Sequence, residues 1–427
     1  MISFNLGPLQ MAKHRKNSFI ISIALLLVQC APLNKMSYSN LAYLYDPDQN
    51  DFRIECLPWH STRDRTDLYF SFSLSDLLYE KKSETDDYLA NFNIHYELFD
   101  LYNDRMLIDS GTVTYPDFPQ DVSGKPFISS FPLKTRYPGE FVLNLTLTDL
   151  NRKQAYTAYC EIKKTSVCSR QNFMLSDEAG SILFESSIGS GQEVVLKYNE
   201  PELPGLWVNY YHSDFPVAGP PFLEQKPVPL AFEPDSLFRV RLFNGETDLL
   251  TFAREGIYFF QADTAVSEGF TLLRLHEGYP GITHPVQMTY PVRYLTTQRE
   301  YEKIETNPDK RKAVEEFWLQ NAGNPGRAAQ MIKRYYTRVE QANQLFTSFQ
   351  EGWKTDRGMI YIIYGNPTIV YRQQDAEQWI YGNEGNILSL TFNFTRVINP
   401  FTDNDFELER SGSYKESWYM AVESWRR

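Results

Sequence analysis

The sequence has few of the residues from which most metal and redox centres are built. Its 427 residues include four cysteines and six histidines, with no Cys-x-x-Cys pair and with the histidines scattered. His276 and His284 flank one turn and could share an ion, but zinc needs three or four protein ligands and no third stands near them. We therefore predict no metal site and no cofactor.

Positive charge is also scarce. The chain carries 42 basic and 54 acidic side chains, for a net charge of -12. Binding to phosphate backbones needs clustered lysine and arginine, and the sequence shows no evident basic stripe. This balance argues against nucleic acid as a partner.

Aromatic residues are abundant. They make up 15% of the chain, and such residues favour half-buried strands. Phe92, Ile94, Tyr96 and Leu98 alternate with their neighbours, a period of two that places one face of a strand in a core. Similar runs recur farther along the chain, which predicts mostly β structure.

These runs divide the chain into domains. Short strands at regular spacing predict an immunoglobulin-like β-sandwich over residues 51–165 and a second one over residues 166–295. Residues 296–427 combine helical and strand patterns, which predicts helices packed on a small antiparallel sheet. The expected fold class is therefore mainly β with a C-terminal α+β module.

Prolines concentrate between Pro201 and Pro234. Proline is excluded from a regular central strand, so this stretch is predicted to be an excursion from the second sandwich. It either covers an edge or offers a surface to a partner. The residues that would form such a surface are Pro216, Pro220, Pro221 and Phe222.

The N-terminus has the pattern of an export signal. A basic stretch from Lys13 to Lys16 precedes an apolar run from Phe19 to Val28, which is too short to span a bilayer as a helix but suits a signal peptide. The run ends in LVQC, which resembles the lipobox of bacterial lipoproteins. The resemblance implies a signal peptide over residues 1–30 and acylation of Cys30.

A lipid on Cys30 would anchor the mature chain, since several acyl chains together bind a membrane firmly. The resemblance favours the outer membrane and its periplasmic face, and the cell surface stays an alternative. The true start of the chain is either Met1 or Met11. Residues 31–50 are predicted to be a polar tether. Export would also permit one disulfide, whose pairing stays open among Cys56, Cys160 and Cys168.

A long amphipathic helix is predicted from Arg327 to Glu351. Its apolar residues recur at steps of three and four and form one stripe, which indicates core packing. Arg334 and Arg338 lie off this stripe. The stripe consists of Ala328, Ile332, Tyr335, Val339, Ala342, Phe346 and Phe349.

The run SFQEGWKTDRGMIYIIYGNP follows this helix and concentrates functional groups. Gly352 is predicted to close the helix in the left-handed conformation, and Trp353 to fold back on its last turn. The residues Thr355–Gly358 have turn chemistry, with Asp356 paired to Arg357 or to backbone amides. The alternation from Ile360 to Tyr364 predicts a buried strand.

The alternative is that this run is an active site. Asp356 would then be a general base, with Lys354 or Arg357 stabilising an anion, but no Ser-His pair, second carboxylate or glycine-rich phosphate loop stands beside it in sequence. We predict no catalytic residue and a structural motif. The motif consists of Gly352, Trp353, Thr355, Asp356, Arg357 and Gly358.

The stretch GWKTDRG, with the helix before it and IYIIYGNP after it, resembles the GWxTD-domain family of bacterial lipoprotein-like proteins. A weaker likeness joins Gly365, Pro367, Trp379, Tyr381 and Phe392 to the SmpA/OmlA family, small lipoproteins that assist outer-membrane β-barrel assembly. The first resemblance implies no activity, because the family has none established. The second implies a role beside barrel proteins.

Together these observations predict a non-enzymatic outer-membrane lipoprotein. It would be an accessory or scaffold subunit of an envelope protein complex, such as one for β-barrel assembly or secretion. One alternative is a surface protein that binds carbohydrate, which requires an open aromatic platform. A second alternative is a hydrolase that uses Asp356. The residues of the platform would be Trp207, Tyr210, Tyr211 and Trp379.

Overall fold

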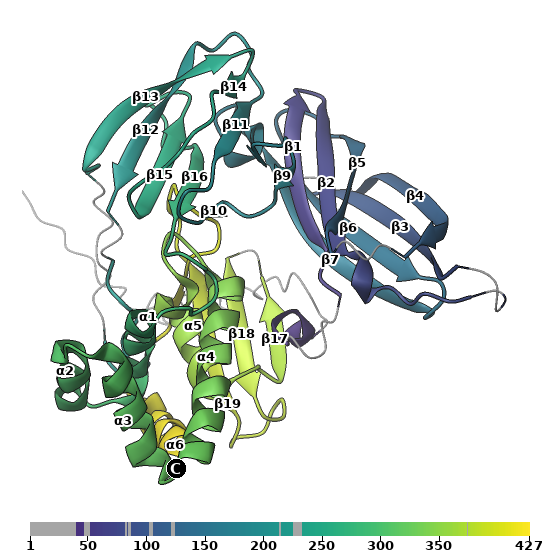
Figure 1. Cartoon of the computed structure of the whole chain (residues 1–427). Helices are drawn as coiled ribbons and strands as arrows, with labels where there is room; N and C mark the ends of the chain where they lie inside the picture. Colours follow the sequence, from purple (N-terminus) through teal and green to yellow (C-terminus); the bar gives the residue numbers. More distant parts are fainter. Residues whose placement is uncertain are drawn as a thin grey trace, which may run out of the picture.

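The computed structural model confirms a mainly β chain that ends in an α+β module (Figure 1). Cys30 and most of the predicted tether lie outside the residues it describes. The described residues are 40–46, 52–81, 83, 87–101, 106–120, 124–212, 215–224, 233–373 and 375–427.

Two sheets form the first domain, and their apolar faces enclose one core that includes the predicted Phe92, Ile94 and Leu98. The strand order is β1-β2-β5 in one sheet and β4-β3-β6-β7 in the other. Because β4 pairs with β3, the order differs from the ABED and CFG sheets of constant immunoglobulin domains. The strands are β1 (Glu55–Thr62), β2 (Arg65–Ser73), β3 (Leu89–Asp100), β4 (Met106–Pro119), β5 (Pro126–Lys134), β6 (Gly139–Asp149) and β7 (Gln154–Lys164), with the 3-10 helices η2 (Leu74–Asp76) and η3 (Arg170–Asn172).

The second domain is one continuous sheet of nine strands, in the order β10-β16-β15-β12-β13-β14-β11-β8-β9. Strand β13 pairs with both β12 and β14 and so joins two halves that share one core. The strands are β8 (Phe173–Asp177), β9 (Ile182–Leu183), β10 (Ser187–Ile188), β11 (Val194–Tyr198), β12 (Gly205–Tyr211), β13 (Ser236–Phe243), β14 (Glu246–Thr247), β15 (Gly256–Gln261) and β16 (Phe270–Arg274).

Helices and a four-stranded antiparallel sheet, β17-β18-β19-β20, form the C-terminal module around the largest apolar core (Figure 1). The predicted stripe of the long helix is buried there at Ala328, Tyr335, Val339, Ala342 and Phe346. The elements are α1 (Pro285–Thr289), η4 (Pro291–Leu295), α2 (Gln298–Thr306), α3 (Lys310–Ala322), α4 (Pro325–Phe346), η5 (Gly352–Lys354), α5 (Asp356–Tyr364), β17 (Ile369–Arg372), β18 (Ala376–Tyr381), β19 (Leu390–Arg396), β20 (Phe406–Leu408), η6 (Gly412–Tyr414) and α6 (Lys415–Arg426).

The strand predicted from Ile360 to Tyr364 is wrong, because these residues belong to helix α5. The helix is buried on all sides from Asp356 to Ile363, and a short run of this kind shows no period that separates a helix from a strand. Gly358 is accordingly a helical residue and does not end a turn.

Part of the predicted tether is also structured. The 3-10 helix η1 (Ala42–Tyr45) packs on the C-terminal module, with Leu41 and Tyr45 buried in its core. The backbone amide of Leu41 donates to the carbonyl of Val370 at 2.9 Å, and the Asn40 side chain accepts from the amide of Val370 at 2.9 Å. The chain therefore reaches the C-terminal module before it enters the first sandwich.

Candidate functional site

The two glycines of the motif allow neighbouring backbone segments to pack closely. Helix α4 ends at Phe346, and Gly352 is not its left-handed cap as predicted. A Cβ atom at Gly352 would lie 2.0 Å from the carbonyl oxygen of Ala342, and one at Gly358 would lie 1.9 Å from the carbonyl oxygen of Gly352. Three backbone segments therefore approach so closely that no larger residue fits without a shift.

Trp353 anchors this joint to the rest of the module. Its side chain is 3% exposed, within the same core as Phe346. Its backbone amide donates to Asn343 Oδ1 at 3.1 Å, and its carbonyl accepts from the Tyr294 hydroxyl at 2.9 Å. The tryptophan thus ties the motif to α4 and to η4.

Thr355 and Asp356 start helix α5 and bind the C-terminal strand. The Thr355 hydroxyl accepts from the amide of Gly358 at 3.0 Å, which is an N-cap. The Asp356 carboxylate accepts from Arg410 at 2.6 Å and from the amide of Leu408 at 2.8 Å. Burial raises the pKa of Asp356, although these two donors oppose the increase. The predicted pairing with a backbone amide is present, and its charged partner is Arg410.

Arg357, the next residue of the helix, pairs with the sheet through other residues. Its guanidinium lies 3.2 Å from Glu377 of β18, donates to Asn404 and sits 4.0 Å from the centroid of the Phe406 ring. Arg357 and Glu377 are each 2% exposed. Two neighbouring charges of the motif therefore hold two different parts of the C-terminal sheet.

Glu377 collects further partners, one of them from the N-terminal segment. The Tyr45 hydroxyl donates to both carboxylate oxygens at 2.9 Å, and Arg372 lies 2.9 Å away. Burial would raise the pKa of Glu377, but Arg357 and Arg372 outweigh it and lower the pKa. The Glu377 carboxylate is therefore ionised and bound by several donors, so its contacts are structural.

The motif also lines a cleft of about 680 Å³ between the nine-stranded sheet and the C-terminal module. In it the His276 ring lies 3.5 Å from Glu351, which also pairs with Lys354, and Gln287 contacts the other ring nitrogen at 2.9 Å. His284 lines the same cleft but caps α1. Asp356 is buried and does not line this cleft, so the base of the hydrolase alternative lies outside it.

The described part of the chain holds no cluster of three or more histidine, cysteine, aspartate or glutamate side chains that could bind a metal ion. Cys56, Cys160 and Cys168 are free thiols. None of the described helices is long and apolar enough to cross a bilayer.

The stretch from Pro201 to Pro234 is not an excursion throughout, because Gly205–Tyr211 form strand β12, but the described residues 215–224 cover the C-terminal module. The amide of Ala218 donates to the carbonyl of Lys354 at 2.8 Å, and the carbonyl of Pro221 accepts from the amide of Ser411 at 3.1 Å. The ring of Phe222 lies 5.5 Å from that of Tyr419, while Pro216 is exposed and Pro220 half-buried.

The four aromatic residues proposed as a carbohydrate platform do not form one. Trp379 is fully buried in the core of the module, and Tyr210 is 5% exposed in the core of the nine-stranded sheet. Trp207 is 37% exposed, and Tyr211 packs edge-on against Phe401.

Sequence reasoning missed Arg410, Glu377 and Tyr45 because each is far from the motif along the chain. It also missed the contact between His276 and Glu351. Thr355 followed by a buried run and then Gly365 was a usable signal for helix α5, since threonine is a common N-cap and glycine a common residue just past a helix.

The chain is mainly β, and the contacts of the motif join the helices of its C-terminal α+β module to the sheet of that module. Residues 256–427 match the family model described as the GWxTD domain, so the chain carries the domain that its motif predicted. The match begins at β15, within the nine-stranded sheet. The predicted boundary at residue 296 is farther along the chain.

No curated protein matches the chain. A solved structure of Bacteroides uniformis beta-glucuronidase 2, covalently bound to cyclophellitol-6-carboxylate aziridine, is 8% identical over 26% of this chain and 13% of that one, with a TM-score of 0.18. Red sea bream transglutaminase is 8% identical over 49% of this chain and 28% of that one, with a TM-score of 0.17. Similarity this low carries no argument about fold or activity.

Proposed function

We propose that this protein is a lipid-anchored, non-enzymatic accessory subunit of an envelope protein complex, such as one for outer-membrane β-barrel assembly or secretion. The observation that carries the proposal is the use of the motif's polar groups. Thr355 caps α5, Asp356 binds Arg410 and Leu408, and Arg357 binds Glu377 and Asn404. A motif used in this way specifies a fold and leaves surfaces free for binding.

The position of the N-terminal segment supports membrane attachment through the GWxTD domain. Asn40 is bound at the start of β17, and Cys30 lies ten residues before it. Ten extended residues span at most ~35 Å. An acylated Cys30 therefore keeps the C-terminal module close to the membrane, with the two β domains available as spacers and binding surfaces.

The test is a pulldown of the tagged protein from native membranes in mild detergent, followed by mass spectrometry. We expect a barrel protein or another envelope subunit to be recovered with it. A Cys30→Ser chain is the control and should lose both the membrane fraction and the partner. Recovery of the acylated protein alone would refute the proposal.

The hydrolase alternative is separated from this proposal by Asp356→Asn. A structural role predicts lower stability, because the variant loses the carboxylate that pairs with buried Arg410. A catalytic role predicts an intact fold and the loss of a reaction. Thermal unfolding of the full chain distinguishes these outcomes.

A further inference from the structure

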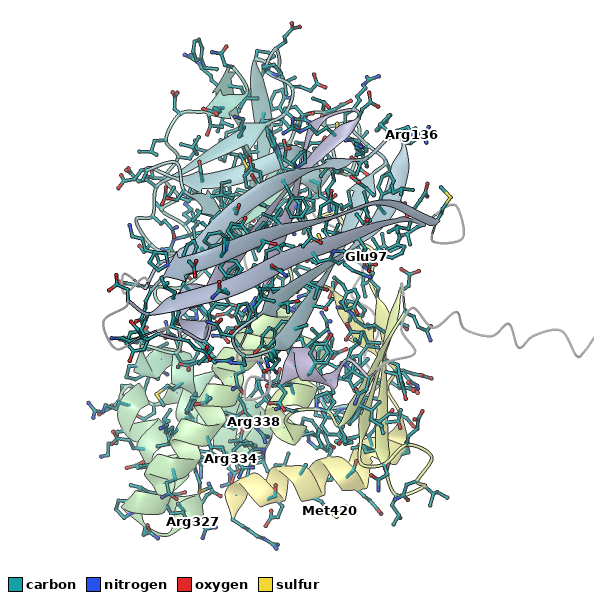
Figure 2. All side chains as sticks on the ribbon, turned by 90° about the vertical axis from the view of Figure 1, so that its right-hand side faces the viewer. Glu97, Arg136, Arg327, Arg334, Arg338 and Met420 are labelled. Atoms are coloured by element: carbon teal, nitrogen blue, oxygen red, sulfur yellow. The ribbon has the colours of Figure 1, made fainter. Side chains whose placement is uncertain are left out.

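A groove beside helix α4 concentrates positive charge in an otherwise acidic protein. The groove has a volume of about 590 Å³, and Lys333, Arg334 and Arg338 of α4 line it. None of its lining residues is acidic. Figure 2 shows Arg327, Arg334 and Arg338 in ascending order along α4, with Arg334 and Arg338 above helix α6. Lys333, Arg334 and Arg338 lie close together in the sequence, but the sequence alone does not show that they line one groove.

The arginines are held in place without carboxylates. Both guanidinium carbons lie 4.9 Å from the centroid of the Trp425 ring. Arg338 also donates to the carbonyl of Ile362 at 3.1 Å, at the C-terminal end of α5. Within the described chain, Lys333, Arg334 and Arg338 form no ion pair within 4 Å. Stacking and backbone contacts therefore orient these cations but leave their charge uncompensated.

Arg334 and Arg338 also repel each other in this groove. Burial lowers the pKa of Arg338, and the neighbouring Arg334 lowers it further. The two charges stay close at a cost that an anion between them would remove. The neutral lining residues Gln330, Gln341 and Asn366 add amide donors around the cations.

We propose that this groove binds a phosphate-bearing anion, with Lys333, Arg334 and Arg338 as its charged contacts. Arginine forks match the oxygens of phosphate in a bidentate geometry, and a fixed guanidinium loses little freedom when it binds. The phosphate comes from a lipid headgroup or from a small soluble compound. The inference goes beyond the proposed function and does not depend on the lipid at Cys30.

The test uses the full chain carrying Cys30→Ser, so that no acyl chain contributes. Binding is measured to vesicles that contain phosphatidylglycerol, to vesicles made only of uncharged, phosphate-free lipids, and to inorganic pyrophosphate by calorimetry. The groove variant is K333Q/R334Q, whose two side chains are exposed and should not be needed for folding. The matched control is R311Q/K312Q, which removes the same charge from exposed positions on α3.

We expect the groove variant to bind phosphate-bearing probes at least about tenfold more weakly, since a charge-assisted contact contributes ~1.5–3 kcal/mol. The control should bind like the parent chain. Binding to phosphatidylglycerol vesicles alone assigns the site to a headgroup, and binding to pyrophosphate as well assigns it to phosphate in general. Absence of binding to both probes, or equal weakening by both variants, would overturn the proposal.

Discussion

The first sandwich and the GWxTD domain stabilise their buried charges in different ways. In the sandwich, Lys164 is 2% exposed and donates to the carbonyl of Arg65 at 2.9 Å and to the Thr135 hydroxyl at 3.1 Å, all neutral acceptors. In the GWxTD domain, Glu377 and Asp356 are bound by arginines from other segments. The comparison teaches that both regions bury an apolar core, and that in the GWxTD domain buried ion pairs also join segments that are far apart in the chain.

The largest effect is expected when a buried ion pair of the GWxTD domain is broken. Arg357→Met leaves Glu377 without one of its two arginine partners. Loss of one partner of a buried pair costs ~3–5 kcal/mol of stability. Its counterpart in the sandwich is Arg65→Met, which breaks an ion pair with Asp67 in which the arginine side chain is 56% exposed, at a cost of ~0–1 kcal/mol. Urea unfolding followed by hydrogen–deuterium exchange reports each domain separately. Equal losses in the two domains would contradict the comparison.

A smaller loss is expected from crowding at the motif. Gly352→Ala places a methyl group against the backbone of α4, and overpacking of this kind costs ~1–3 kcal/mol. The upper end is expected because a backbone oxygen cannot rotate away. Gly412→Ala is the control, because nothing lies within 4 Å of its Cβ position. Thermal unfolding should show a lower midpoint for the first variant only.

Removal of one hydroxyl group should weaken the contact between the N-terminal segment and the GWxTD domain. Tyr45→Phe removes the hydroxyl that donates to Glu377, a bond to a charged group worth ~1.5–3 kcal/mol; we expect the lower end, because Arg357 and Arg372 remain. Tyr159→Phe, at a position 52% exposed in the sandwich, should change stability by less than ~0.5 kcal/mol. Faster exchange of the Leu41 amide in the first variant would show release of the segment. Unchanged exchange would refute the assignment.

The smallest expected effects are opposite responses to pH. In the sandwich, burial lowers the pKa of His60 to about 4; the unfolded state binds more protons between this value and ~6.5, so stability rises with pH across that window. In the GWxTD domain, burial raises the pKa of Asp405 to about 6. The folded state then binds more protons between ~3.9 and that value, so stability falls as pH rises through this window.

Across one pH unit inside its window, each group changes the free energy of unfolding by at most ~1.4 kcal/mol. Urea midpoints of each domain measured between pH 4 and pH 6.5 should show opposite slopes. His60→Gln and Asp405→Asn should flatten the slope of their own domain and leave the other unchanged. Slopes of the same sign in both parent domains would contradict the prediction.

Local patterns were sufficient to predict much of this fold. The alternation at Phe92, Ile94 and Leu98 marked a buried strand face, and the stripe through Tyr335 and Val339 marked the buried face of α4. Both elements are amphipathic, so their period is visible in the sequence. Helix α5 is buried on every side and has no such period.

The partners of the motif could not be predicted in the same way. Asp356 and Arg357 were identified as structural, but Arg410 lies 54 residues from Asp356, and Glu377 lies 20 residues from Arg357. Tyr45 is 332 residues from Glu377. A single sequence carries no signal for contacts over these separations, because they depend on how whole elements pack.

The docking of residues 40–46 also determines how the chain responds to mechanical force. A pull applied at Asn40 reaches the backbone bonds to β17 and the buried Tyr45 before it reaches the first sandwich. Tension between Asn40 and the C-terminus is therefore borne inside the GWxTD domain. The two β domains form a long excursion outside the line of force, so a load on the N-terminal segment leaves them folded until that contact breaks.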